Sequence, residues 1–444
     1  MRKLASMLVA VVAIGLTTCS QRFLEDLFVI PFATERFVVF VDPDFMKPLI
    51  SDPADYTLTK ETQQQKRNDL KDQIVKLFLT RYGVTIVPSQ IVVDVAIAVI
   101  LNLESAKADV IRQDTTTINS VARDVRVQGR PIQQSPPIIQ GRPIQQNEKL
   151  TAAGWGLVRR NGYWLSCAAE KAGGTVDGST RPAKIWIVDT GIAVDNPYLN
   201  VDTQNAQNFT VNPPSSNAYD DNGHGTAVAG VAASRKIKLN ASMTICSSVS
   251  AGAKVVPIKV LDATGGGDWS NILRSLDYIA IKGSKDDVIN MSLGDFPIKN
   301  CTGEIPNLET TLVNAASKFF VVVAAGNDGD DVMRTVPGCI NGPDGTRIYT
   351  VASASCGNQC ENFSNYGASV DWLAVSNVFT TYLKDPVSQE WTFIATSGTS
   401  ISSAVISGLI HSTGRAPNRG ASVYCNVMPV LPGEQATEYF FGTR

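Results

Sequence analysis

Histidine and unbalanced charge are both scarce in this chain. Only two of its 444 residues are histidine, and 39 Lys and Arg stand against 41 Asp and Glu, which leaves a net charge of −2. The sequence contains no long run of either sign, so it lacks both the basic surface typical of nucleic-acid-binding proteins and an acidic tail. We therefore expect no nucleic-acid partner.

Apolar runs long enough to anchor the chain in a membrane are also missing. The two longest, residues 4–16 and 91–103, are shorter than the roughly 20 residues of a transmembrane helix. Asp94 interrupts the second run, which we interpret as buried core. We therefore expect no membrane partner.

The N-terminal run has the pattern of a secretory signal peptide. Two basic residues precede it and small polar residues follow it, with a predicted cleavage near Ser20. We accordingly assign residues 1–20 to the signal and predict a secreted, extracellular protein. A lipid anchor at Cys19 is the alternative.

The remaining cysteines suit an oxidising compartment, where most should pair and one of an odd number should stay free. The segment CGNQC is better explained by a local disulfide or two separate bridges than by zinc, because the chain has few histidines and no second closely spaced pair. The spacing does not give the connectivity. The seven cysteines are Cys167, Cys246, Cys301, Cys339, Cys356, Cys360 and Cys425.

Residues 21–127 have the pattern of a small α+β module. A strand is expected over 36–42 and an amphipathic helix up to Gly83, with apolar residues on one helical face. A second helix near 103–114 and an alternating strand near 118–128 follow. The apolar residues of the first helix are Leu70, Ile74, Leu77 and Phe78.

Residues 128–150 are expected to form a linker. The heptapeptide QGRPIQQ occurs at 128 and again at 140, and its Pro, Gln and isolated Arg content favours an extended, accessible chain. The linker is either a simple spacer or the carrier of a processing site, and we favour the second interpretation.

From residue 151 to 444 apolar strand-like runs alternate with helical stretches that begin near His224, Ser270, Leu308 and Ser400. This alternation predicts an α/β fold with a parallel sheet covered on both faces, and sites in such folds form at the carboxyl ends of the strands. The runs are 183–189, 253–261, 286–294, 319–327, 347–355 and 370–375.

Three residues of this region together point to nucleophilic catalysis. Asp189 ends the run IWIVD, His224 lies between glycines at a helix start, and Ser400 lies in TSGTS before a helix. Taken singly, such an Asp is more often a turn or cap residue, such a His is more often a structural hydrogen-bonding residue, and such a Ser could be only an N-cap. Together they supply a hydroxyl nucleophile, its base and the carboxylate that orients the base.

Asn327 is the fourth candidate, because it ends the apolar run VVVAAGN. Its amide could donate to a developing oxyanion beside the backbone N–H of Ser400 at a helix start.

These four segments resemble the motifs of the subtilisin-like serine proteases. IVDTGIAVDNPYL is similar to the family's aspartate motif, NGHGTAVAG to its histidine motif, AAGN to its oxyanion asparagine and SGTSISSAVISG to its serine motif. The order Asp, His, Ser is subtilisin's own, and the GxSxG elbow of α/β-hydrolases is absent. The resemblance covers about residue 155 to the C-terminus. It implies a subtilisin-like three-layer fold and a serine endopeptidase that cleaves polypeptides without a cofactor for catalysis.

The resemblance also implies a self-processing precursor. Residues 21–127 resemble the family's inhibitory propeptide, with a maturation cut between about 128 and 154. The segment around Ser292, Leu293 and Gly294 would bind an extended substrate by strand addition. Four nearby acids would favour a basic residue before the cut, or are solvated loop acids or calcium ligands; they are Asp295, Asp328, Asp330 and Asp331.

The chain departs from the family in two places. Where the family has Met-Ala-x-Pro after the serine, this chain has residues 401–404, Ile-Ser-Ser-Ala. The usual calcium-loop pattern is not evident, so structural calcium is unassigned and no metal site is predicted. A catalytically inactive binding protein of the same fold is the alternative function, against which the retention of all four residues argues. His411 has no motif and is expected to be structural or on the surface.

Overall fold

The computed structural model describes most of the chain outside the first 33 residues. The predicted signal peptide lies outside the described residues. The described ranges are 34–46, 60–94, 96–124, 126–129, 133–134, 138–139, 157–160, 163–211, 213–239, 243–295, 297–298, 301, 307–343, 345–425 and 437–444.

The N-terminal unit is a four-stranded antiparallel sheet with helices packed on one face, as the α+β pattern predicted. The strands lie in the order β2-β3-β1-β4. Its elements are β1 (Glu35–Val41), α3 (Pro43–Met46), α4 (Lys60–Tyr82), β2 (Ile91–Val92), β3 (Ala98–Leu103), α5 (Ser105–Arg112) and β4 (Ile118–Arg123).

Strand β1 is apolar on both faces because each face is buried. Phe37 and Val39 pack against the module's own helices, in a cluster with Leu70 of α4. Val38 and Phe40 point the other way and join the core of the rest of the protein. Successive side chains of a strand alternate between faces, so one strand joins two cores.

The centre of the molecule is a mostly parallel sheet in the order β12-β17-β11-β19-β21-β22-β23-β27-β26, with β13 also paired to β17. Only β26 pairs antiparallel. The strands are β11 (Ile185–Asp189), β12 (Asn200–Val201), β13 (Gln207–Asn208), β17 (Lys254–Lys259), β19 (Val288–Met291), β21 (Phe320–Ala324), β22 (Ile348–Ala354), β23 (Trp372–Val375), β26 (Asn418–Cys425) and β27 (Thr437–Thr443).

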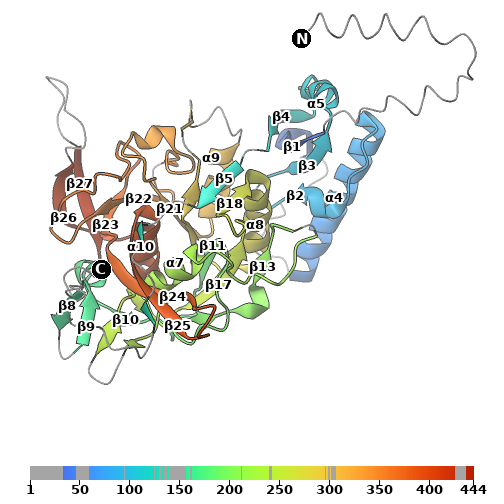
Figure 1. The fold of residues 1–444 in the computed structure, drawn as a ribbon. Coiled ribbons are helices and arrows are strands. Elements are labelled where there is room, and N and C mark those ends of the chain that lie inside the picture. The colour runs from blue at the N-terminus through green and yellow to red at the C-terminus, as the bar shows by residue number, and fades with distance from the viewer. Residues whose placement is uncertain are drawn as a thin grey trace, which may run out of the picture.

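Helices cover both faces of this sheet, which confirms the predicted three layers (Figure 1). Helices α7 (His224–Ala233) and α10 (Thr399–Thr413) share a core with Ile185 and Ile187 of β11. Helices α8 (Trp269–Lys282) and α9 (Leu308–Ala316) share the opposite core with Trp186 and Val188. The continuous apolar run IWIV is therefore a strand buried on both faces.

The N-terminal unit lies against α8 and α9, where Figure 1 shows its blue strands beside both helices. Asp124 Oδ1 accepts a hydrogen bond from Ser270 N at the first turn of α8, at 2.8 Å. Arg36 Nη1 lies 2.6 Å from Asp268 Oδ2. Asn307 Nδ2, at the start of α9, donates to Ser120 Oγ at 3.1 Å.

Short strands complete the fold around this framework. The hairpin of β24 (Val378–Lys384) and β25 (Trp391–Ser397) packs beside α7 and leads directly into α10. The others are β5 (Arg126–Gly129), β6 (Gln133–Gln134), β7 (Ile138–Ile139), β8 (Leu157–Arg160), β9 (Tyr163–Ser166), β10 (Val176–Asp177), β14 (Ile237–Lys238), β15 (Thr244–Cys246), β16 (Ser250–Ala251), β18 (Gly266–Asp268) and β20 (Leu293–Gly294), with helix α6 (Cys167–Lys171). The 3-10 turns within the described ranges are η2 (Pro88–Gln90), η4 (Thr203–Asn205) and η5 (Val332–Arg334).

The predicted linker is extended in its described residues, where it pairs with the edges of other strands. Strand β5 pairs with β18 and β20, and strands β6 and β7 pair with β25. Extended backbone carries unpaired N–H and C=O groups, and these sheet edges satisfy them.

The cysteines pair over long distances. Disulfides join Cys167 to Cys356 and Cys301 to Cys339. Cys360 is also disulfide-bonded, so CGNQC contributes to two separate bridges. Among the described cysteines, Cys246 is free and buried. No helix in the described ranges is both long and apolar enough to cross a membrane.

Candidate active site

The fold brings Asp189, His224 and Ser400 together at the carboxyl end of the sheet. His224 Nδ1 lies 2.7 Å from Asp189 Oδ1, and His224 Nε2 lies 3.1 Å from Ser400 Oγ. Asp189 is the last residue of β11, His224 the first of α7 and Ser400 the second of α10. Asp189 is 35 residues from His224 in the chain, and His224 is 176 residues from Ser400. Tertiary packing alone brings the three side chains together.

Glycines allow the aspartate and histidine segments to approach each other. A Cβ on Gly225 would lie 2.1 Å from the carbonyl oxygen of Gly191 and 3.2 Å from Asp189 Cβ. Gly223 has φ of 102°, and a Cβ there would lie 2.3 Å from the Tyr382 ring. Only residues without a side chain fit these positions, so the motif NGHG has a steric basis.

A buried carboxylate that the sequence analysis missed holds the histidine loop. Asp220 is fully buried and accepts hydrogen bonds from Thr190 Oγ1, the backbone N–H of Gly223, and both the N–H and the hydroxyl of Thr226, at 2.6–2.8 Å. Thr190 Oγ1 accepts in turn from Gly225 N at 2.9 Å. The signal that could have found Asp220 is its place three residues before a glycine at a helix start.

A buried lysine forms hydrogen bonds at the carboxyl ends of β11 and β17. Lys259 pairs in register with Asp189 and is 3% exposed. Its Nζ donates to the carbonyl oxygens of Thr190 and Leu261, both at 2.8 Å, and lies 2.6 Å from Asp221 Oδ1. Its ammonium charge is thus both paired and hydrogen-bonded, which a buried charge requires.

Serines hold the helix that carries Ser400. Ser292 Oγ donates to the carbonyl of Ser400 at 3.0 Å and lies 2.9 Å from Ser403 Oγ. Asn290 Nδ2 donates to Ser292 Oγ at 2.8 Å and Ser407 Oγ donates to Asn290 Oδ1 at 2.9 Å. This polar chain fixes the N-terminal half of α10 in a chain that lacks the family's proline.

Asn327 lies beside the same helix start. Its Oδ1 accepts from Thr399 N and Thr399 Oγ1 at 2.9 and 2.8 Å. With the oxygen used in this way, the amide nitrogen is the end that can donate elsewhere. Asn365, which the sequence analysis missed, braces the loop: its Oδ1 accepts from Asp328 N and Asp330 N, at 2.9 and 3.1 Å.

The predicted substrate-binding segment is a sheet edge in the structure. Leu293 and Gly294 form β20, and β5 lies between β20 and β18, antiparallel to both. The side chain of Ser292 points into the protein to hold α10, but its carbonyl oxygen lies 3.4 Å from Ser400 Oγ. An extended chain on this edge therefore runs directly past the nucleophile candidate.

The four nearby acids have different surroundings. Asp330 is paired with Arg334, and Asp331 accepts from Met333 N at the start of η5. Asp328 is exposed on the loop after Asn327, and its Oδ2 accepts from Asn365 Nδ2 at 3.2 Å. The backbone of Asp295 pairs with that of Val336. Within the described ranges no group of three His, Cys, Asp or Glu residues could hold a metal ion.

His411 has a structural place. It is 1% exposed, and its ring nitrogens lie 2.8 Å from Ser250 Oγ and 2.9 Å from the carbonyl oxygen of Ala183. Burial lowers its pKa below the ordinary value. It is therefore a buried core histidine, as the sequence analysis expected of a structural residue.

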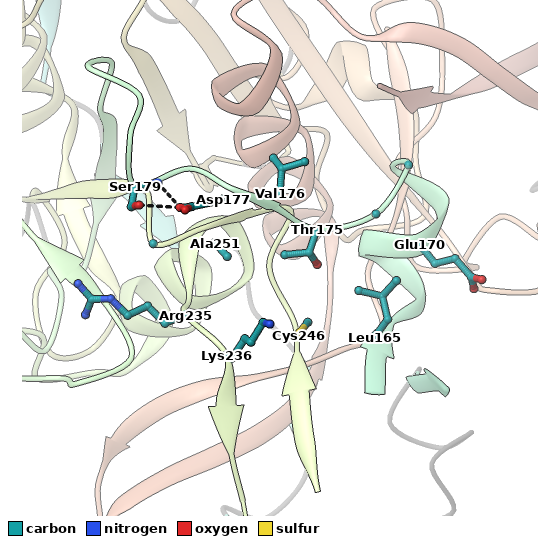
Figure 2. A pocket seen from close by; sticks show the side chains of 13 residues that line it. Leu165, Glu170, Thr175, Val176, Asp177, Ser179, Arg235, Lys236, Cys246 and Ala251 are labelled. Atoms are coloured by element: carbon teal, nitrogen blue, oxygen red, sulfur yellow. Dashed lines mark hydrogen bonds between the residues drawn. The ribbon is translucent and has the colours of Figure 1, made fainter. Parts of the chain in front are cut away.

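A cavity of about 780 Å³, whose lining is shown in Figure 2, includes none of the three residues in its walls. Arg235 and Lys236 line it just after the C-terminal end of α7, whereas His224 begins that helix. Ten helical residues at 1.5 Å each separate the two ends by about 15 Å. The cavity is thus not part of the site around Ser400.

Comparison with known proteins agrees with this geometry. Residues 181–413 match the model of the subtilase family. The chain is 31% identical to thermitase of Thermoactinomyces vulgaris over 56% of this chain and 82% of that protein. It is 30% identical to a subtilase-type proteinase of Schizosaccharomyces pombe, over 58% of this chain and 53% of the relative.

An extracellular serine proteinase of a Thermus species is 28% identical over 62% of this chain and 61% of the relative. Two of these three relatives are thus matched over less than two thirds of their length. The matched region includes β11, α7, the Asn327 loop and all of α10, which carry the four candidate residues on the subtilisin-like three-layer fold. On this family match, residue order and architecture, the chain belongs to the subtilase family.

Proposed function

We propose that this protein is a secreted serine endopeptidase made as a self-processing precursor. The observation that carries the proposal is the hydrogen-bonded line from Asp189 through His224 to Ser400, with Asn327 at the start of the same helix. Membership of the subtilase family and the matched serine proteinases support it. The predicted signal peptide supports secretion.

In the proposed reaction Ser400 Oγ attacks the carbonyl carbon of a peptide bond while His224 Nε2 takes its proton. Asp189 accepts the Nδ1–H of His224 and stabilises the imidazolium. The amide of Asn327 and the N–H of Ser400 donate to the oxyanion. His224 then protonates the leaving nitrogen, and water hydrolyses the acyl-enzyme by the same steps.

The N-terminal unit is proposed to be the inhibitory propeptide, comprising residues 21–127. This proposal is supported by the antiparallel pairing of β5 with the edge of β20, where an extended substrate would bind. Val127 is 1% exposed there and belongs to the core with Leu261 and Leu293. Backbone pairing and a buried side chain together would keep substrates out of the cleft.

The test is to express the full chain beside Ser400→Ala and to determine the N-terminus of each secreted product by mass spectrometry. We expect a new N-terminus between about residues 128 and 154 in the unmutated protein alone, and labelling of that protein by a fluorophosphonate probe. An unmutated protein that is neither cut nor labelled would instead support the binding-protein alternative. Cutting of both proteins would assign maturation to another protease.

Asn327→Ala gives a graded test of the same site. We expect kcat to fall by about 10²–10³-fold, the loss known for removing the corresponding donor in subtilisin itself. KM should change little, because the oxyanion forms only in the transition state. A loss confined to KM would contradict the proposed role.

A further inference from the structure

Two acidic side chains lie at the edge of β18, one in the loop before the strand and one at its end. The side chains of Asp262 and Asp268 are 45% and 26% exposed. Asp262 Oδ1 accepts hydrogen bonds from Thr264 N at 2.9 Å and from Gly266 N at 3.2 Å. Asp268 is the residue before α8, yet its side chain caps none of the helix N–H groups. The local structure therefore accounts for one oxygen of Asp262 and for neither oxygen of Asp268.

A guanidinium group of the segment paired with this edge lies between the two carboxylates. Arg126 Nη2 is 3.6 Å from Asp262 Oδ2, and Arg126 Nη1 is 4.0 Å from Asp268 Oδ1. A Cβ built on Gly266 would lie 2.5 Å from Arg126 Nη2, so this glycine leaves the space that the guanidinium fills. Val127, the next residue of β5, is buried in the core, and alternation along the strand turns Arg126 the opposite way. The edge of β18 thus offers a basic side chain both opposite charge and room.

The pairing of β5 also gives the position of this side chain relative to a cleaved bond. Gly129 pairs antiparallel with Leu293, so a substrate in the same register has its next residue opposite Ser292. The carbonyl oxygen of Ser292 lies 3.4 Å from Ser400 Oγ, so that substrate residue supplies the carbonyl group that the hydroxyl attacks. Counted back from that residue as the first, the substrate residues in the places of Gly129 and Arg126 are the second and the fifth before the cleaved bond.

We propose that Asp262 and Asp268 are specificity-determining residues, which select Arg or Lys at the fifth position before the bond that is cleaved. This inference rests on the proposed function. In the uncut chain Arg36 of the N-terminal unit also contacts Asp268, with Nη1 2.6 Å from Oδ2. Departure of that unit would remove Arg36 and Arg126 together and leave two carboxylates facing the cleft. A polypeptide with a cationic side chain at the fifth position restores the charge balance there, whereas an acidic side chain meets like charge.

The expected preference is modest, because all three side chains are partly exposed to water. The side chain of Arg126 is 65% exposed. Exposed ion pairs of this kind change an equilibrium constant by about 1.4- to 5-fold each, so the two acids together should favour Arg over Ala by about three- to tenfold in kcat/KM. Salt should screen this attraction, since it acts between exposed charges.

The experiment uses the secreted form of the full chain that takes the fluorophosphonate probe, with three peptide pools as substrates. The pools carry Arg, Ala or Glu at one position, followed by Val as in β5, and the remaining residues are randomised. Mass spectrometry compares kcat/KM for the bond after the fifth residue, counting the varied residue as the first. We expect the order Arg, Ala, Glu, with Arg about three- to tenfold above Ala at low ionic strength and within about twofold of it in about 0.5 M salt. A pool with Arg moved one residue toward the N-terminus is the control and should lose the gain.

Substitutions at the two acids separate this role from a structural one. In the double variant Asp262→Asn and Asp268→Asn, the ratio of Arg to Ala should fall to within about twofold of one. Asparagine still offers an acceptor to Thr264 N, so the loop is kept. Asp268→Lys should reverse the order, so that the Glu pool is cut faster than the Arg pool. Asp286→Asn is the matched control and should keep the ratio, because its side chain is 49% exposed and it lies before β19, at the amino end of the sheet.

The outcomes of this experiment separate the inference from the proposed function. Equal kcat/KM for the Arg and Ala pools in the unmutated enzyme would overturn the inference, and so would a preference that survives in the double variant. An unmutated chain that never takes the probe, or that takes it and cuts no pool, would instead overturn the proposed function. The two failures are therefore distinguishable.

Discussion

Two buried carboxylates, Asp220 in the site and Asp277 on α8, have opposite surroundings. Asp220 accepts hydrogen bonds from hydroxyl and N–H groups at the base of the histidine loop, with no acid among those partners. Asp277 accepts from the N–H groups of Val93 and Asp94 of the N-terminal unit, but the Asp94 carboxylate lies near it. Burial, and then the charge of Asp94, raise the pKa of Asp277 to about 7.

The difference teaches which of the two contacts depends on the protonation of a second carboxylate. The partners of Asp220 are hydroxyl and N–H groups, so no neighbouring acid opposes the hydrogen bonds that hold the loop of His224. The contact between the N-terminal unit and α8 contains two carboxylates whose mutual repulsion depends on protonation. We therefore expect this contact to weaken as the pH rises.

The largest effect is expected from a substitution in the loop that carries His224. Gly225→Ala puts a methyl group 2.1 Å from the Gly191 carbonyl and 3.2 Å from Asp189 Cβ. The segments must separate, and a displacement of about 1 Å in a catalytic group costs on the order of 10² in rate. We expect kcat/KM to fall at least that far. Gly357→Ala, whose nearest atom would be at 3.6 Å, is the control and should keep full activity in the same peptidase assay.

The next effect concerns the contact between Asp277 of α8 and the N-terminal unit. Because the pKa of Asp277 is raised from an ordinary 3.8 to about 7, its contribution favours the docked state fully below pH 4 and is lost as the pH rises to about 7. Burial also raises the pKa of Asp94, and each proton that the docked pair holds more tightly should weaken docking by up to about tenfold per pH unit over that range. The strength of docking is measured from urea unfolding of the uncut Ser400→Ala chain between pH 5 and 8. Undocking of the N-terminal unit should be the first transition.

Asp277→Asn is the variant that sharpens this test, because it keeps an acceptor for the two N–H groups and removes the charge. Its first unfolding transition should no longer shift with pH between 5 and 8. The basic residues Arg67, Lys71 and Lys318 also act on this pair and lower the pKa of Asp94. An unchanged pH dependence in the variant would assign the effect to other groups.

The smallest effect concerns the residue after the nucleophile candidate. Ile401 is fully buried beside Ser400 and carries no thioether that peroxide could oxidise. Ile401→Met should therefore make the enzyme more sensitive to dilute peroxide while leaving the initial kcat/KM within a few fold. The measurement is the rate of activity loss in peroxide. Equal sensitivity of the two proteins would mean that oxidation acts elsewhere.

The sequence allowed the four candidate residues and the layered fold to be predicted, because each rests on a local signal. Asp189 and Asn327 follow buried apolar runs, and His224 and Ser400 follow glycines at helix starts. Asp220 and Asn365 were missed, since their roles depend on which backbone groups the fold brings to them.

By itself, the sequence determined the order and chemistry of the candidate triad, the alternation that produces a parallel sheet, and the repeated heptapeptide. Only the tertiary structure decided that the heptapeptide region pairs with three sheet edges, that Asp94 meets Asp277, and that Cys167 reaches Cys356. The physical reason is that strand edges and buried charges acquire partners from distant segments. Local propensity fixes an element's type, but its partner depends on how the whole chain packs.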